Sequence, residues 1–110
     1  MQTTHDAPVA EIVRFRLKPG ADVPSFVADA RATLAFVERM GGMMSRQLSV
    51  DEHGVWTDYL TWQSMEAARN AQAAAMQEPS FGPYMSHIDA ESVEMRHADL
   101  HWSVGDATPN

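Results

Sequence analysis

The chain contains no cysteine, a single lysine and no long apolar run. The lack of cysteine excludes disulfides, thiolate catalysis and cysteine-based zinc sites. No apolar run approaches the roughly 20 residues that a membrane-spanning helix needs. Positive charge is also scarce, since 8 basic residues stand against 15 acidic ones and the formal net charge is -7. Phosphate backbones and anionic lipid surfaces repel such a chain, so we expect neither nucleic acid nor a membrane as a partner.

Several functional signals are absent as well. The N-terminal residues MQTTHDAPVA lack the positive and apolar regions of a signal peptide, which favours a cytoplasmic protein. Neither a glycine-rich phosphate loop nor a nucleophile elbow is present. His97 and His101 lie four residues apart on a predicted strand, roughly 13 Å, which is too far for one metal ion to bridge. We therefore expect no metal site and no bound cofactor.

The length of 110 residues fits one domain. Residues 1–8 are polar and are predicted to form a flexible arm, and residues 103–110 a flexible tail. Residues 9–102 then make up the folded domain.

Six periodic segments fill this domain. Alternation of apolar and polar residues predicts strands, while apolar residues at helical spacing, with Asp22 and Ser64 as N-caps, predict two helices. Gly41 and Gly42 supply the stop of the first helix. Pro79 ends the second, and a loop with a short helical turn follows at 80–88. The predicted strands are 9–17, 43–50, 55–63 and 92–102, and the predicted helices are 22–40 and 65–78.

The order β-α-β-β-α-β predicts a ferredoxin-like α+β fold, a four-stranded antiparallel sheet with both helices on one face. Alternation alone does not tell which face of each strand meets the helices. Apolar side chains such as Met44, Tyr59 and Leu60 nevertheless fall on both sides of the strands. Since two helices cover one face, the second face would be an apolar patch larger than soluble monomers expose. We expect two copies to cover it by packing sheet to sheet as a homodimer.

Three segments resemble a known family. They are VRFRLKPG with the helix after it, TWQSMEAA at 61–68, and SVEMRHADL at 92–100. Together they are similar to the dimeric α/β-barrel superfamily, in its branch of antibiotic-biosynthesis-monooxygenase-like proteins. The resemblance implies paired ferredoxin-like subunits, each with a pocket between sheet and helices. It also implies cofactor-independent oxygenation of aromatic compounds as one activity of the group. Haem degradation is another, but this sequence does not match the register of the iron-binding histidine in the haem-degrading members.

Candidate site residues follow from this expected pocket. We interpret His87 and His97 as candidate catalytic groups, because imidazole transfers protons near neutral pH. The alternative for His87 is a surface position beside a loop. Aromatic residues near the expected pocket are candidates for substrate binding, although core or interface packing explains aromatic residues equally well. These aromatic candidates are Trp62, Tyr84, Phe15 and Phe36.

Charged residues also occur inside predicted strands, among them Arg46 and Asp58. Charges in a two-sided sheet should be paired, so we expect an ion-pair network between Asp58 and the arginines, with an anion site as the alternative.

The function that the resemblance implies is a monooxygenase-like enzyme without bound cofactor that acts on a small apolar or aromatic compound. The alternative is a non-catalytic dimeric module that binds a hydrophobic metabolite or a protein.

Overall fold

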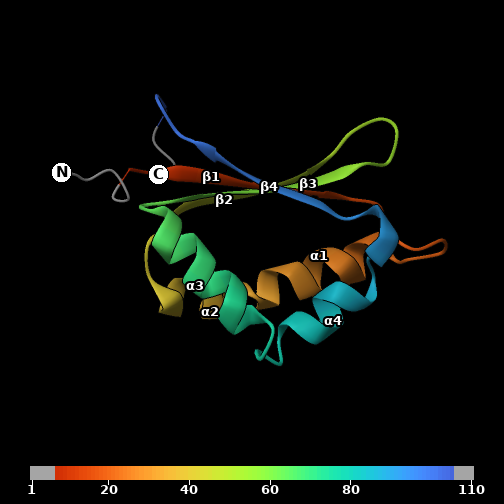
Figure 1. The fold of residues 1–110 in the computed structure, drawn as a ribbon. Coiled ribbons are helices and arrows are strands. Elements are labelled where there is room, and N and C mark those ends of the chain that lie inside the picture. The colour runs from red at the N-terminus through yellow and green to blue at the C-terminus, as the bar shows by residue number, and fades with distance from the viewer. Residues whose placement is uncertain (1–6, 106–110) are drawn as a thin grey trace.

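The computed structural model describes residues 7–105, so the arm predicted at the start of the chain and the end of the predicted tail lie largely outside the described residues. Four antiparallel strands form one sheet in the order β2-β3-β1-β4. All helices lie on one side of it, and the other face is bare (Figure 1). The predicted ferredoxin-like α+β fold is thus confirmed. The elements are β1 (Val9–Phe15), α1 (Val23–Ala32), α2 (Leu34–Met40), β2 (Met43–Val50), β3 (Trp56–Trp62), α3 (Met65–Ala75), α4 (Phe81–Ser86), a 3-10 turn (Ala90–Ser92) and β4 (Glu94–Asp99).

The first helical segment is interrupted, and the prediction of one helix over 22–40 was wrong. Thr33 separates α1 from α2: its backbone N–H donates to the Ala30 carbonyl, three residues back, and its hydroxyl donates to the same oxygen at 2.6 Å. That hydroxyl also accepts a hydrogen bond from Nη1 of Arg46 at 2.8 Å. A buried threonine that bonds the preceding turn bends a helix, and here a strand residue holds it in place.

Other element ends are close to the prediction. Asp22 and Ser64 do cap α1 and α3, accepting from the backbone N–H of Ser25 and Ala67. Helix α3 ends at Ala75 rather than at 78, because the residue before Pro79 is biased away from helical geometry. Strand β4 ends at Asp99 rather than at 102, since its partner Val9 is the first residue of β1.

Two apolar clusters join the sheet to the helices and settle which face is covered. One packs Val9, Leu60 and Trp62 against α2 and α3. The other packs Phe15 and Trp56 against α1 and α4. Alternate residues share a face, so β1 turns Val9, Glu11, Val13 and Phe15 toward the helices, and β3 turns Trp56, Asp58, Leu60 and Trp62. Two carboxylates therefore lie on the covered side.

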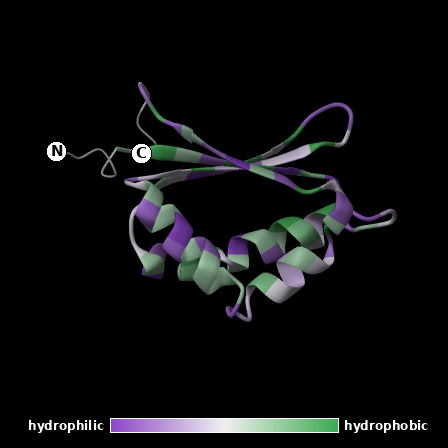
Figure 2. Ribbon diagram, in the orientation of Figure 1, coloured by the Kyte–Doolittle hydropathy of each residue, from purple (hydrophilic) through white to green (hydrophobic). Residues whose placement is uncertain are grey.

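The bare face is more polar than the sequence predicted. Leu60, which had suggested apolar surface on both sides, belongs to the covered side, and so do Trp56 and Met95. The strand register instead groups Ile12 and Tyr59 on the bare face with Gln47 and Arg96. Figure 2 shows both hydrophobic and hydrophilic residues along the strands. Among the described residues, no helix is long and apolar enough to cross a membrane.

Candidate functional site

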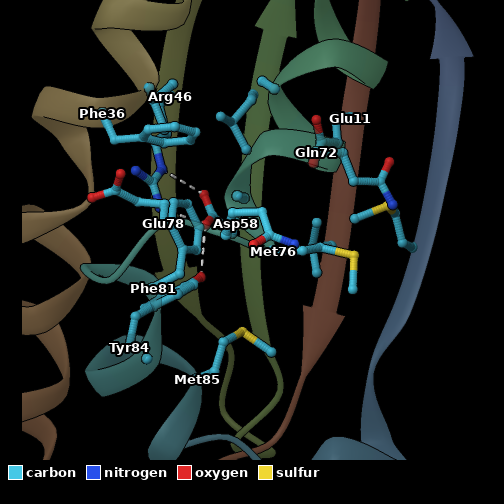
Figure 3. A pocket seen from close by; sticks show the side chains of 18 of the residues that line it. Glu11, Phe36, Arg46, Asp58, Gln72, Met76, Glu78, Phe81, Tyr84 and Met85 are labelled. Atoms are coloured by element: carbon cyan, nitrogen blue, oxygen red, sulfur yellow. Dashed lines mark hydrogen bonds and ion pairs between the residues drawn. The ribbon is translucent and has the colours of Figure 1, made fainter.

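A cavity of about 580 Å³ lies between the covered face of the sheet and the helices. Ligand pockets typically measure roughly 300–1,000 Å³, so this space fits a small organic molecule. The sheet contributes its floor, and α2, α3, α4 and the α3–α4 connection contribute the walls (Figure 3). Its lining is predominantly apolar, with aromatic rings from Phe36, Trp62, Phe81 and Tyr84.

One side of the cavity floor carries a closed polar network. Arg46 on β2 donates from Nε to Oδ1 of Asp58 at 3.0 Å and from Nη2 to Oδ2 at 2.8 Å. The Tyr84 hydroxyl donates to the same Oδ2 at 2.7 Å. Since Nη1 of Arg46 donates to Thr33, the network ties the sheet, the α1–α2 junction and α4 together. The ion pair predicted for Asp58 with an arginine is confirmed (Figure 3).

Burial fixes the protonation of this network. Burial, and then the negative charge of Asp58, raise the pKa of the Tyr84 hydroxyl far above its ordinary value. Burial acts to lower the pKa of Arg46, but the hydrogen bonds and charge of Asp58 outweigh it and the pKa is raised. Tyr84 thus remains a neutral phenol that donates, and Arg46 remains a cation.

Glu11 on β1 stands apart from this network. The side chain is buried, with 8% of the residue exposed, and its Oε1 accepts a hydrogen bond from Nε1 of Trp62 at 2.9 Å. Within residues 7–105 no cationic group lies within 4 Å of its carboxylate. Burial raises the pKa of Glu11, and the Trp62 hydrogen bond opposes that rise. The cavity floor therefore holds a carboxyl group with a raised pKa, which accepts a proton more readily than an ordinary glutamate does.

The aromatic residues singled out from the sequence divide into two groups. Trp62, Tyr84 and Phe36 line the cavity. Phe15 does not line it: the ring is buried in the second apolar cluster, edge-on to Phe26 and Tyr84. Phe15 therefore supports the wall behind Tyr84, and its predicted contact with a substrate stays a prediction.

Both candidate catalytic histidines lie outside the cavity lining. Nε2 of His87 is 2.8 Å from Oδ2 of Asp29, and its ring packs edge-on against Phe26 at the α1–α4 contact. His97 lies directly opposite Glu11 in the β1–β4 ladder. Its Nε2 is shielded from solvent without a hydrogen-bond partner among the described residues. Burial, and then the positive charge of Arg69, lower the pKa of His97, which keeps the imidazole neutral.

Sequence reasoning did not select Glu11 as a site residue, although its pattern held a signal. Glu11 is the carboxylate that interrupts an otherwise apolar strand face, and a buried charge on such a face demands a partner or a function. No group of three or more His, Asp or Glu residues within 7–105 is arranged to hold a metal ion.

Comparisons with known proteins add the fold relationship. No protein-family model and no curated protein sequence matches the chain. Solved structures do match. SnoaB from Streptomyces nogalater, described as a cofactor-independent oxygenase, aligns with a TM-score of 0.73 and 17% identity over 91% of this chain and 99% of that chain.

A second match has the same strength. A protein from Bordetella bronchiseptica, provisionally named an antibiotic biosynthesis monooxygenase, aligns with a TM-score of 0.73 and 15% identity over 87% of this chain and 99% of that chain. A protein from Caulobacter crescentus with the same provisional name aligns with a TM-score of 0.71 and 14% identity over 89% and 93% of the two chains. Identities this low establish a shared fold, and function must be argued from the site.

Proposed function

We propose that this protein binds a small, largely apolar aromatic compound between its sheet and helices and oxygenates it without a bound cofactor. The observation that carries the proposal is the cavity of about 580 Å³, which is lined with aromatic rings. Its floor holds the carboxyl group of Glu11, which has no cation within 4 Å among residues 7–105. The cofactor-independent oxygenase SnoaB, which shares the fold, supports the reaction class. A cytoplasmic location, expected from the sequence, belongs to the same proposal.

The reaction requires a proton acceptor from the protein and electrons from the substrate. A substrate CH₂ activated by a neighbouring carbonyl or ring loses one proton to the Glu11 carboxylate, which the raised pKa suits to this task. The carbanion delivers electrons to O₂, a C–O bond forms, and Glu11 returns the proton to give a hydroperoxide. Loss of water then leaves a carbonyl, so that CH₂ and O₂ become C=O and H₂O.

The histidines enter this scheme unequally. His97 lies opposite Glu11 in the β1–β4 ladder, is neutral, and has an Nε2 without a hydrogen-bond partner within residues 7–105. This supports a role as a relay that takes the proton from Glu11 and gives it back before the hydroperoxide forms. His87 is engaged with Asp29 outside the cavity and has no part in the proposed mechanism.

Oxygen consumption with anthrone tests the proposal. Anthrone is an apolar tricyclic ketone with an activated CH₂, and the expected reaction uses one O₂ for each anthrone converted to anthraquinone. Glu11→Gln should lower the rate by about 100-fold, the usual contribution of a general base. Glu94→Gln, which removes an exposed carboxylate from the other face of the sheet, should not change it. A wild-type rate equal to that of buffer with heat-denatured protein would count against catalysis.

The alternative is a non-catalytic module that binds a hydrophobic metabolite. The observation favouring it is that Arg46, Asp58 and Tyr84 satisfy one another, so that most polar groups of the cavity are already committed to structure. Tight binding of aromatic compounds with no oxygen uptake would decide for this alternative.

We also propose a homodimer formed through the bare face of the sheet. Helices leave that face uncovered (Figure 1), and Ile12 and Tyr59 lie near its centre. Sedimentation at micromolar concentration should report roughly twice the chain mass of 12.2 kDa. Ile12→Asp should shift the particle to the single-chain mass, and a wild-type protein already at 12.2 kDa would overturn the dimer.

A further inference from the structure

The cavity has an unbalanced charge. Its charged lining consists of Glu11, Asp58 and Glu78 as acids and Arg46 as the basic residue. Glu78 sits beyond α3 and lies 3.5 Å from the exposed Arg39. Asp58 is neutralised by Arg46 through two hydrogen bonds. Glu11 thus contributes a negative charge that nothing on the cavity floor cancels.

The two-pronged face of Arg46 is already occupied by a protein carboxylate. Nε and Nη2 donate to Asp58 and Nη1 donates to Thr33, which uses three of the five guanidinium N–H groups. A ligand carboxylate that took this face would have to displace Asp58, and any ligand carboxylate in the cavity would also meet the charge of Glu11. Because like charges repel in a desolvated site, the cavity disfavours such ligands.

Glu11 can instead receive a donor. Its Oε1 accepts from Trp62, while no hydrogen bond to Oε2 is present within residues 7–105. The carboxyl group lies on the cavity floor, and Gln72 lines the same cavity (Figure 3). A ligand hydroxyl or ammonium placed there would make a charge-assisted hydrogen bond to this oxygen.

We propose that Glu11 is the specificity-determining residue of the cavity, which accepts neutral or cationic aromatic compounds bearing an O–H or N–H donor and refuses aromatic carboxylates. This inference rests on the proposed function only in taking the cavity as the ligand site. It narrows the substrate class from apolar aromatic compounds in general to those without an acidic substituent.

Four compounds that share the naphthalene ring and differ in the head group test the charge selection. They are 1-naphthylmethylamine, 1-naphthalenemethanol, 1-methylnaphthalene and the carboxylate 1-naphthaleneacetate. Binding is followed at pH 7.5 by calorimetry and by quenching of tryptophan fluorescence, to which Trp62 in the cavity wall contributes. We expect the amine and the alcohol to bind about tenfold more tightly than the carboxylate, equivalent to about 1.4 kcal/mol.

Substitution of Glu11 tests whether this residue alone causes the preference for the amine over the carboxylate. In Glu11→Gln the amide can still accept from Trp62, so the fold is kept, and circular dichroism checks this. The preference for the amine over the carboxylate should fall to within about twofold, mostly through tighter binding of the carboxylate. Glu94→Gln removes one carboxylate from the opposite face of the sheet and should keep the wild-type preference.

The outcomes separate the inference from the proposed function. Binding of all four compounds with equal affinity, or a charge preference that survives in Glu11→Gln, would overturn the inference and leave the cavity as the ligand site. Failure of every compound to bind would instead remove the proposed function and the inference together.

Discussion

The two buried carboxylates of the cavity floor face the same helices from neighbouring strands and have opposite surroundings. Asp58 on β3 is 4% exposed and takes hydrogen bonds from Arg46 and Tyr84. Glu11 on β1 is 8% exposed and takes one from Trp62. Both are buried, yet within residues 7–105 Asp58 has a cationic partner and Glu11 has none within 4 Å.

This difference separates structure from reactivity. A buried carboxylate that is fully paired stays ionised and fixes the elements around it, because breaking the pair would strand a charge. A buried carboxylate without a cation binds its proton more readily and responds to what enters the cavity. Asp58 is therefore expected to hold the fold together, and Glu11 to meet the ligand. Three substitutions test that division.

The largest effect is expected when Asp58 loses its cation. Arg46→Met keeps an unbranched apolar stem but leaves Asp58 without its cation in the interior and removes the donor to Thr33. We expect a loss of about 3–5 kcal/mol in the free energy of unfolding, measured by urea denaturation. Arg46→Lys should lose less, since it retains the charge without the two-pronged geometry.

Arg31→Met is the matched control for this loss. Arg31 is exposed on α1, and its replacement should change stability by no more than about 0.5 kcal/mol. If Arg46→Met were as stable as Arg31→Met, the structural role assigned to the Asp58 network would be wrong.

A smaller effect is expected at the third member of the network. Tyr84→Phe preserves the stacking on Phe26, whose ring centroid is 5.5 Å away, and removes the 2.7 Å hydrogen bond to Asp58. Because hydrogen bonds to charged groups contribute about 1.5–3 kcal/mol, thermal and urea unfolding should report a loss in that range. A loss no larger than about 0.5 kcal/mol, the range of ordinary surface substitutions, would contradict the assignment.

The sequence predicts the frame of this site better than its chemistry. Alternation along 9–17 and 55–63 correctly places Val9 with Phe15, and Trp56 with Trp62, on common faces, since a period of two is a local property. The caps Asp22 and Ser64 are local as well. The break at Thr33 is not, because it depends on Arg46, which reaches it from a strand beyond the helix.

The roles of the functional residues could not be predicted from the sequence for a related reason. The pairing of Arg46 with Asp58 could be expected. That this pairing leaves Glu11 without a cation could not, because it depends on how β1, β2 and β3 come together in the sheet. His87 and His97 carry attractive chemistry, yet whether an imidazole enters a cavity depends on packing rather than on residue type. His87 is hydrogen-bonded to Asp29, and His97 lies opposite Glu11 in the ladder without lining the cavity.

The smallest effect expected is a change in pH dependence at Glu11. The folded protein holds the Glu11 proton above its ordinary pKa of 4.5, mainly because of burial. In the window just above 4.5 the folded state thus binds more protons at this group than the unfolded state does, and wild-type stability falls as pH rises through that window. Glu11→Gln cannot titrate. Its stability relative to wild type should therefore be lowest below pH 4.5, increase as pH rises, and level off once Glu11 is ionised in both states.

Urea unfolding of both proteins from pH 4 to pH 8 measures this difference, in which the titration of all other groups cancels to first order. The charged neighbours act in opposite directions: Asp58 raises the pKa of Glu11 further and Arg46 lowers it, while burial lowers the pKa of His97 across the ladder. A difference that falls with rising pH would mean that Glu11 has a cationic partner in the folded protein. Glu11 would then be a charge-paired structural carboxylate like Asp58, and the distinction between the structural and the reactive carboxylate would no longer hold.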